Sequence, residues 1–144
     1  MTRTEIFTNI KSRITVPEIN GDLIWCSDIR TLKNKATEVY EHENHLSLDF
    51  GEITIFNNIK LRFGTNSNDN YKLKSITGTY AKYQDAKALC DKLIPILNNP
   101  DENYDVEEQL FVSWADENIE IKVCTRDHHG GPWFEYSITK KNCT

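Results

Sequence analysis

Apolar side chains alternate with polar ones over much of this chain, and this period of two residues constrains the fold more than any other feature. The alternation is clearest in three central segments, Leu46–Phe50, Ile53–Ile55 and Ile59–Phe63. Successive side chains of a strand point to opposite faces, so such segments predict strands with one buried and one exposed face. Short breaks at Gly51 and at Asn57-Asn58 predict hairpins, which would join the three segments into a meander.

Further segments extend this pattern along the chain. A fourth strand is predicted over Tyr71–Tyr80, with a bulge where the phase of the alternation shifts between Leu73 and Ile76. Turn residues at Ala115–Asn118 and Asp127–Pro132 separate the later segments. Four more apolar segments predict strands: Leu23–Cys26, Leu110–Trp114, Ile119–Val123 and Phe134–Ile138.

Apolar residues spaced three and four apart predict helices in other parts of the chain. Thr2 followed by Glu5 is typical of a helix start, and Asp28 is a second candidate cap. Pro95 lies inside a helical pattern, where it is expected to kink or shorten the helix. Three helices are expected: about Arg3–Arg13, about Ile29–Glu41 and about Gln84–Leu97.

The order of these elements indicates the fold class. Strands with one exposed face are typical of antiparallel sheets, and the regular β-α-β alternation of nucleotide-binding folds is absent. We therefore expect an α+β fold, with an antiparallel β-sheet of about six to eight strands and about three helices packed on one face. A chain of 144 residues has the usual size of one domain, so residues 1–144 are expected to form a single domain.

Charge and hydropathy narrow the function classes. The formal net charge is −5 and Lys and Arg do not cluster, which argues against nucleic-acid binding as the main function. The longest apolar runs, such as Leu23–Cys26, are far shorter than the ~20 residues of a membrane-spanning helix. The polar N-terminal segment lacks the apolar core of a signal peptide. We expect a cytoplasmic protein without a membrane partner.

The four cysteines form no CxxC pair of a metal or redox site. Cys26, Cys90 and Cys124 lie inside apolar patterns, and free cysteine behaves as a small buried hydrophobe. These three are therefore expected to be reduced thiols in the core. Cys143, next to the end of the chain, is expected to be exposed.

The densest group of reactive side chains is Asp127, His128 and His129, beside Gly130-Gly131 in a predicted turn. One reading makes a histidine a general base or metal ligand, alone or paired with Cys124 as a nucleophile. The other reading is a polar hairpin whose glycines give backbone freedom. No phosphate-binding or hydrolase motif accompanies the group. We favour the polar hairpin, and predict no catalytic residue, metal ligand or cofactor.

A strong charge asymmetry distinguishes residues 101–120, which contain eight acidic residues and no Lys or Arg. A solvated loop and strand edge would explain it, but such a surface also suits a basic protein partner, because opposite charge speeds association. Tyr104 and Trp114, together with Trp133 further along the chain, are candidate aromatic anchors. The predicted partner-binding residues are Asp101, Glu102, Tyr104, Asp105, Glu107, Glu108, Trp114, Asp116, Glu117 and Glu120.

The size, the acidic balance and the run AKYQDAKALCDKLIPILNN, followed by three short strands, resemble the immunity proteins of bacterial toxin systems, including those of contact-dependent inhibition. The resemblance is one of overall build and covers the last third of the chain best. It implies a cytosolic inhibitor that binds a cognate toxin domain, often a basic nuclease.

Three hypotheses of function follow. The first is a non-enzymatic binding protein, a monomer that neutralises a cognate, basic toxin. The second is a small hydrolase or metal-dependent enzyme built on Asp127, His128 and His129. The third is a homodimer formed through a sheet edge at Phe134–Ile138, although Pro132 and Glu135 would blunt such an edge.

Overall fold

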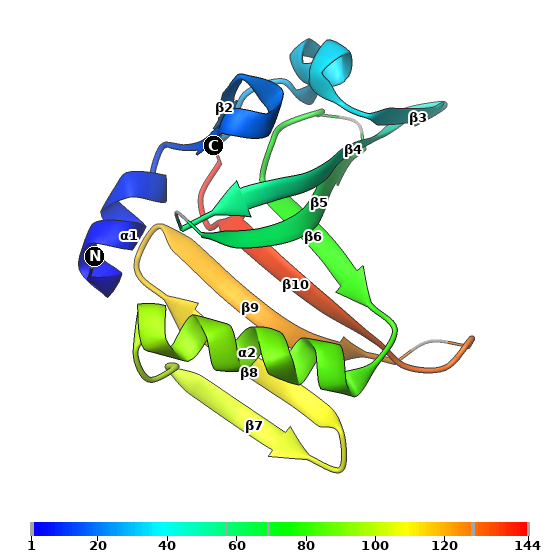
Figure 1. Cartoon of the computed structure of the whole chain (residues 1–144). Coiled ribbons are helices and arrows are strands. Elements are labelled where there is room, and N and C mark those ends of the chain that lie inside the picture. Colours follow the sequence, from blue (N-terminus) through cyan, green and yellow to red (C-terminus); the bar gives the residue numbers. More distant parts are fainter. Residues whose placement is uncertain (1, 57, 69, 128, 144) are drawn as a thin grey trace.

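The computed structural model of the chain describes residues 2–56, 58–68, 70–127 and 129–143. In this part of the chain, eight strands form one antiparallel sheet in the order β3-β4-β5-β6-β10-β9-β8-β7 (Figure 1). A separate hairpin pairs β1 (Arg13–Val16) with β2 (Gly21–Ile24). The strands of the large sheet are β3 (Glu38–His42), β4 (His45–Ile55), β5 (Ile59–Ser67), β6 (Ser75–Tyr80), β7 (Glu102–Val106), β8 (Gln109–Ala115), β9 (Ile119–Arg126) and β10 (Trp133–Lys140).

Two α-helices and two short 3₁₀ helices of the described residues accompany the sheet. They are α1 (Arg3–Ile10), η1 (Pro17–Ile19), η2 (Ile29–Lys35) and α2 (Tyr83–Leu97). The α+β class is thereby confirmed. Helix α2 lies against β6, β9 and β10 and buries one stripe of side chains: Ala86, Leu89, Cys90, Leu93 and Leu97. Both 3₁₀ helices contact β4 instead. The packing of all three predicted helices on one face stays a prediction.

The predicted helix ends are partly right. The Thr2 hydroxyl accepts a hydrogen bond from the Glu5 backbone N–H at 3.2 Å, which confirms the first cap. The helix ends at Ile10, however, and Ile14 is buried in β1 instead of extending the helical stripe. Pro95 lies in the last turn of α2, which continues to Leu97. None of the described helices is both long enough and apolar enough to cross a membrane.

The predicted helix over Ile29–Glu41 is wrong in its second half. Asp28 caps η2 by accepting the Arg30 N–H, as expected for a cap. After Lys35 the chain becomes extended, and Thr37 donates its backbone N–H and its hydroxyl to the Asp49 carbonyl oxygen. Residues 38–42 then pair with β4 as strand β3. Pairing with a long neighbouring strand supplies hydrogen bonds that outweigh the local helical pattern.

The central strands are confirmed in kind and corrected in their bounds. The segments Leu46–Phe50 and Ile53–Ile55 are one strand, β4, because Gly51 forms a bulge at φ 71° instead of a turn. The predicted strand Tyr71–Tyr80 is shorter, because residues 71–73 leave the sheet and bond with residues 26–29. The expected edge at Phe134–Ile138 is wrong: β10 is an interior strand between β6 and β9.

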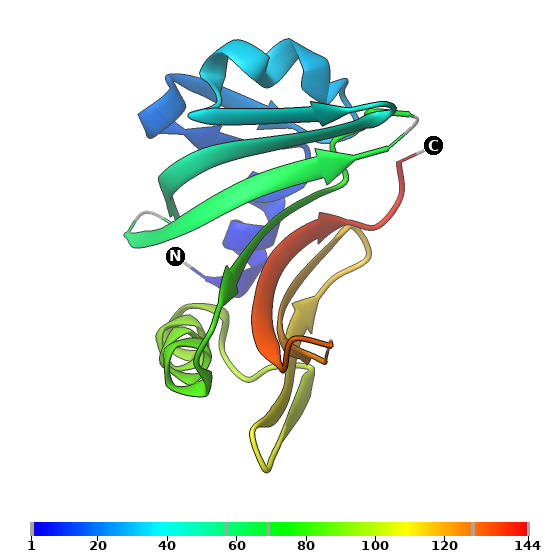
Figure 2. The ribbon, with the colours of Figure 1, turned by 90° about the vertical axis from the view of Figure 1, so that its right-hand side faces the viewer.

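The sheet opens between β5 and β6, where the ladder has a single registered pair, Gly64 with Thr77. Figure 2 shows the two strands diverging from this point. The Tyr136 hydroxyl spans the opening and donates to the Arg62 carbonyl oxygen at 2.8 Å. Burial is the main cause that raises the pKa of Tyr136 to about 12. This side chain therefore joins the β3-β4-β5 part of the sheet to the part that carries α2.

The cysteines differ from the prediction at two positions. Cys26 is joined to Cys143 by a disulfide that links residues 117 positions apart, so neither is a free thiol. Cys90 and Cys124 are buried free thiols, as predicted. Burial raises the pKa of both, to about 11 for Cys90. The disulfide was missed because no spacing rule pairs cysteines that are so far apart in sequence.

Candidate functional site

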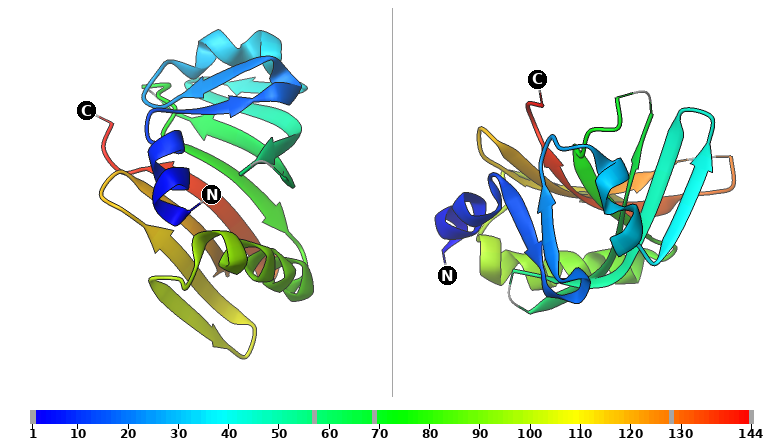
Figure 3. Two further views of the ribbon diagram at one scale, coloured as in Figure 1. Left: turned by 60° about the vertical axis from the view of Figure 1, so that its left-hand side comes forward. Right: turned by 90° about the horizontal axis from the view of Figure 1, so that it is seen from above.

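The acidic stretch folds into the β7–β8 hairpin at one edge of the sheet. Figure 3 places this hairpin at the end of the molecule opposite β1, β2 and η2. Strand β7 was not predicted as a strand. It forms one edge of the large sheet, and all five of its residues are exposed. The charge count in the sequence therefore identified an acidic segment, and the structure shows that much of this segment is a β-hairpin.

The turn of this hairpin consists of Glu107 and Glu108, with φ angles of 51° and 65°. Two-residue hairpin turns of this kind favour Asn-Gly, because both positions need a left-handed backbone. A side chain with a Cβ pays roughly 1–2 kcal/mol in that conformation. Here two adjacent carboxylates also repel each other. The tip is thus a disfavoured choice of residues for stability alone.

Asp105 fixes the turn end of β7 to helix α2. Its carboxylate accepts the Tyr83 hydroxyl at 2.7 and 2.8 Å and lies 3.1 Å from the Lys87 ammonium. The Tyr83 hydrogen bond is the main cause that lowers the pKa of Asp105 and, in return, raises the pKa of Tyr83. This carboxylate therefore has a structural role.

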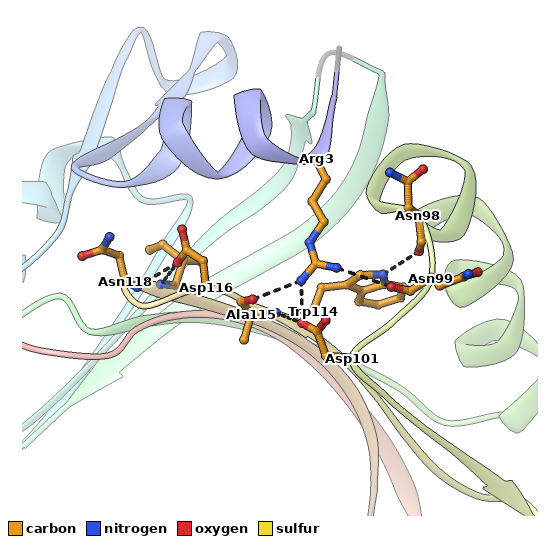
Figure 4. A network of polar contacts seen from close by, with 9 residues as sticks. Arg3, Asn98, Asn99, Asp101, Trp114, Ala115, Asp116 and Asn118 are labelled. Atoms are coloured by element: carbon orange, nitrogen blue, oxygen red, sulfur yellow. Dashed lines mark hydrogen bonds and ion pairs between the residues drawn. The ribbon is translucent and has the colours of Figure 1, made fainter.

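A second network fixes the start of the hairpin to helix α1 (Figure 4). The Arg3 guanidinium donates to the Asp101 carboxylate at 2.5 Å and to the Ala115 carbonyl oxygen at 3.0 Å. Asp101 also accepts the Ala115 N–H at 2.8 Å. Nearby, the Asp116 carboxylate accepts the N–H groups of Asn118 and Ile119, both at 2.8 Å, and so closes the β8–β9 turn.

The eight acidic residues thus fall into two groups. Asp101 and Asp105 hold the hairpin in place, Asp116 closes the β8–β9 turn, and Glu120 lies 3.9 Å from Lys122. The other four carboxylates have no hydrogen-bond or ion-pair partner among the described residues. They are all glutamates at exposed positions: Glu102, Glu107, Glu108 and Glu117.

The predicted aromatic anchors also fall into an exposed and a buried group. Tyr104 is 54% exposed on β7 and can contact a partner. Trp114 is fully buried and donates its indole N–H to the Asn98 carbonyl oxygen at 2.9 Å, so it belongs to the core and is removed from the predicted surface. Trp133, on β10, is half-buried. Sequence reasoning missed Val106, which is 50% exposed on β7.

Acidification is expected to destabilise the anchored hairpin. Hydrogen bonds from Arg3 and from Tyr83 lower the pKa of Asp101 and Asp105. A lowered folded-state pKa contributes stability above the unfolded value of about 4, and this stability is lost as pH falls through the folded-state pKa. The melting temperature should therefore fall as the pH drops below about 4, and less steeply in Asp105→Asn. Parallel melting curves for the two proteins would contradict this role of Asp105.

The His-rich turn is only partly described. Asp127 and His129 are exposed between β9 and β10, and His128 lies outside the described residues. Within the described ranges, no group of three or more His, Cys, Asp and Glu side chains is placed to hold a metal ion. Burial is the main cause that raises the pKa of Cys124, whereas a nucleophilic cysteine needs a lowered pKa.

Hollows elsewhere on the surface were not predicted from the sequence. A cleft of ≈ 540 Å³ lies at the opening between β5 and β6, where Arg62 and Asp49 form an ion pair at 3.0 Å. A groove of ≈ 780 Å³ runs beside α1 and β1 and is lined by apolar side chains such as Ile10, Ile14 and Phe56. Neither brings together the nucleophile and base of a hydrolase among the residues that line it.

Comparison with known proteins adds no relative: no family model, curated protein or solved structure matches the chain.

Proposed function

We propose that this protein is a non-enzymatic binding module that captures a basic protein partner with its β7–β8 hairpin. One observation carries the proposal. Glu102, Glu107, Glu108 and Glu117 surround the hairpin, are exposed, and have no partner among the described residues. The other carboxylates of the segment support the local structure, so these four are the ones left for binding.

Physical chemistry favours a cationic partner for this surface. Each unpaired glutamate adds repulsion to a protein that already carries a net charge of −5. A basic surface relieves that repulsion and is steered to the hairpin by the electrostatic field. Tyr104 and Val106 add exposed apolar area between the charged ends of β7. Such a mixture of aromatic and charged side chains is typical of interface hot spots.

The specific form that we propose is an immunity protein, which neutralises a cognate bacterial toxin domain in the cytoplasm. A toxin that acts on nucleic acid must carry basic residues for the phosphates, and an acidic hairpin can occupy the same surface. Cytoplasmic proteins rarely keep disulfides, because the compartment is reducing. In that compartment Cys26 and Cys143 would be thiols, and the inhibitor must work without the cross-link.

The test is co-expression in bacterial cells with the toxin domain encoded directly upstream of the gene for this chain. Cells that make the toxin alone should stop growing, and cells that also make this protein should grow. A Cys26→Ser, Cys143→Ser double variant should protect equally well if the site of action is reducing. Growth arrest despite full expression of the protein would refute the immunity function.

Removal of the four unpaired charges should slow association with the partner. Changing Glu102, Glu107, Glu108 and Glu117 to Gln is expected to lower the association rate constant about tenfold at low salt, and by much less at high salt. Stopped-flow or surface-plasmon-resonance measurements at two ionic strengths give this rate constant. The melting temperature should not fall, because none of the four side chains holds the fold and their removal relieves repulsion at the turn.

A matched control removes the same charge elsewhere. The exposed residues Glu38, Glu43, Glu52 and Asp127 lie outside the hairpin, and changing them to Gln or Asn produces the same net charge. This control should associate faster than the hairpin variant at low salt. Equal rates in the two variants would mean that only net charge matters and that the hairpin is not the binding surface.

A further inference from the structure

The open edge of β7 has a feature beyond its charge, namely backbone groups that no neighbouring strand occupies. The two-residue turn closes on the pair Val106 with Gln109. In such a hairpin the closing pair exchanges both hydrogen bonds, and bonded and non-bonded pairs then alternate along the ladder. Glu102, Tyr104 and Val106 therefore bond inward to β8. Asn103 and Asp105 direct their N–H and C=O groups outward, away from the sheet.

Side chains along this edge are ordered by face. Residues directly opposite each other in a ladder share a face, so Tyr104 lies beside Phe111 and Glu102 lies beside Ser113. Val106 follows on the same face. This face presents an apolar middle, Tyr104 and Val106, with carboxylates at the start of the strand and at its turn. An added strand would meet a negative position at Glu102, then the two apolar positions, and then the acidic turn.

Contacts within the protein fix the conformation of β7 in the absence of a partner. Asp105 is bonded to Tyr83 and Lys87 on α2, and Asp101 is bonded to Arg3 on α1. These contacts fix β7 both at its start and near its turn. A rigid edge loses little conformational freedom on binding, which favours affinity.

A second copy of this chain is a poor occupant of the edge. The other open edge of the sheet is β3, with the sequence Glu-Val-Tyr-Glu-His. Pairing β7 with another β7, or with β3, would bring the exposed glutamates of two strands close together, and this repulsion between like charges disfavours the pair. Charge complementarity instead selects a strand with cationic side chains.

We infer that β7 is an acceptor edge, on which an extended cationic segment of the partner protein adds as one more strand. The segment exchanges backbone hydrogen bonds with Asn103 and Asp105. Its Lys or Arg side chains reach Glu102 and the Glu107–Glu108 turn, and an apolar side chain between them covers Tyr104. This inference rests on the proposed function and specifies how the hairpin holds its partner.

A short synthetic peptide tests this mode of binding. The probe is acetyl-Lys-Thr-Val-Thr-Lys-Thr-amide, in which two Lys and the Val between them lie on the same face of a strand. Its control carries N-methyl groups on alternate residues, in both registers, so that charge is kept while one row of N–H donors is lost. Two-dimensional ¹⁵N NMR of the full chain follows the binding. The unmodified peptide should shift the amide signals of β7 and protect those of Asn103 and Asp105 from hydrogen exchange. At least one N-methylated peptide should bind tenfold more weakly.

Variants of the protein at Asn103 provide a second test of strand addition. Asn103→Pro removes one outward N–H at an edge position, where proline is tolerated, and Asn103→Ala keeps it. The Pro variant should bind the peptide at least tenfold more weakly than the Ala variant. If the Pro variant does not fold, the N-methylated peptides decide alone. Equal binding of methylated and unmethylated peptides overturns strand addition.

The outcomes separate this inference from the proposed function. Binding that depends on the four glutamates but not on Asn103 or on peptide N–H groups overturns strand addition and leaves the charged binding surface in place. Signal shifts confined to β3 or to other surfaces overturn both, because the hairpin is then not the site of contact.

Discussion

Loss of the Cys26–Cys143 disulfide is expected to lower the free energy of unfolding by about 3 kcal/mol. The cross-link joins residues 117 positions apart, and closing so long a loop restricts the unfolded chain strongly. Chain-entropy arguments give about 4–5 kcal/mol for such a loop, and typical measured values are about 2–4 kcal/mol. Urea denaturation of the oxidised protein and of the Cys26→Ser, Cys143→Ser double variant measures the difference directly.

Two controls make this experiment specific. Dithiothreitol should destabilise the unmodified protein but leave the double variant unchanged, because Cys90 and Cys124 are buried thiols outside any disulfide. These thiols should also resist alkylation in the folded state at pH 8, since burial raises the pKa of both. Equal unfolding free energies for the oxidised protein and the double variant would contradict the stabilising role of the cross-link.

Replacement of Gly78 by Ala is expected to cost about 3 kcal/mol of stability, by overpacking at the opening of the sheet. A Cβ at this position would lie 2.3 Å from the Arg62 carbonyl oxygen and 2.4 Å from the Tyr136 ring. The first of these is backbone, which cannot move aside without shifting β5. The Tyr136 hydroxyl, which bonds that same carbonyl oxygen, would be displaced as well.

A matched substitution isolates this clash. Gly130→Ala introduces the same methyl group at an exposed turn, where a Cβ meets no atom within 4 Å. Its unfolding free energy should stay within about 0.5 kcal/mol of the original protein. Urea denaturation of both variants supplies the comparison. Similar stabilities for the two variants would show that β5 and β6 can separate further at little cost.

Interior strands were predictable because their burial leaves a local pattern. In β4, β5, β9 and β10, buried and exposed side chains alternate along neighbouring residues. A segment of a few residues is therefore enough to detect the strand in the sequence. Edge strands leave no such pattern. All residues of β3 and of β7 are exposed, and the two apolar residues of β7, Tyr104 and Val106, are too few to stand out within an acidic segment. This is why one was taken for part of a helix and the other for a loop.

The candidate site was predictable as a segment but not residue by residue. Counting charges located the acidic hairpin, because eight carboxylates without a cation are visible in sequence. Which carboxylates are structural depends on partners far away: Arg3 is 98 positions from Asp101, and Tyr83 is 22 positions from Asp105. Trp114 was assigned to the surface for the same reason, since its burial depends on the packing of the whole sheet.

The disulfide also decides how the chain responds to mechanical force. Because Cys26 and Cys143 are joined, the segment from Cys26 to Cys143 forms a closed covalent ring. Pulling on handles fused to the two ends can then stretch only about 27 residues, roughly 100 Å, against roughly 500 Å for the open chain. An unfoldase that threads one strand at a time would have to pass two strands of the ring together, unless a reductant had first opened it.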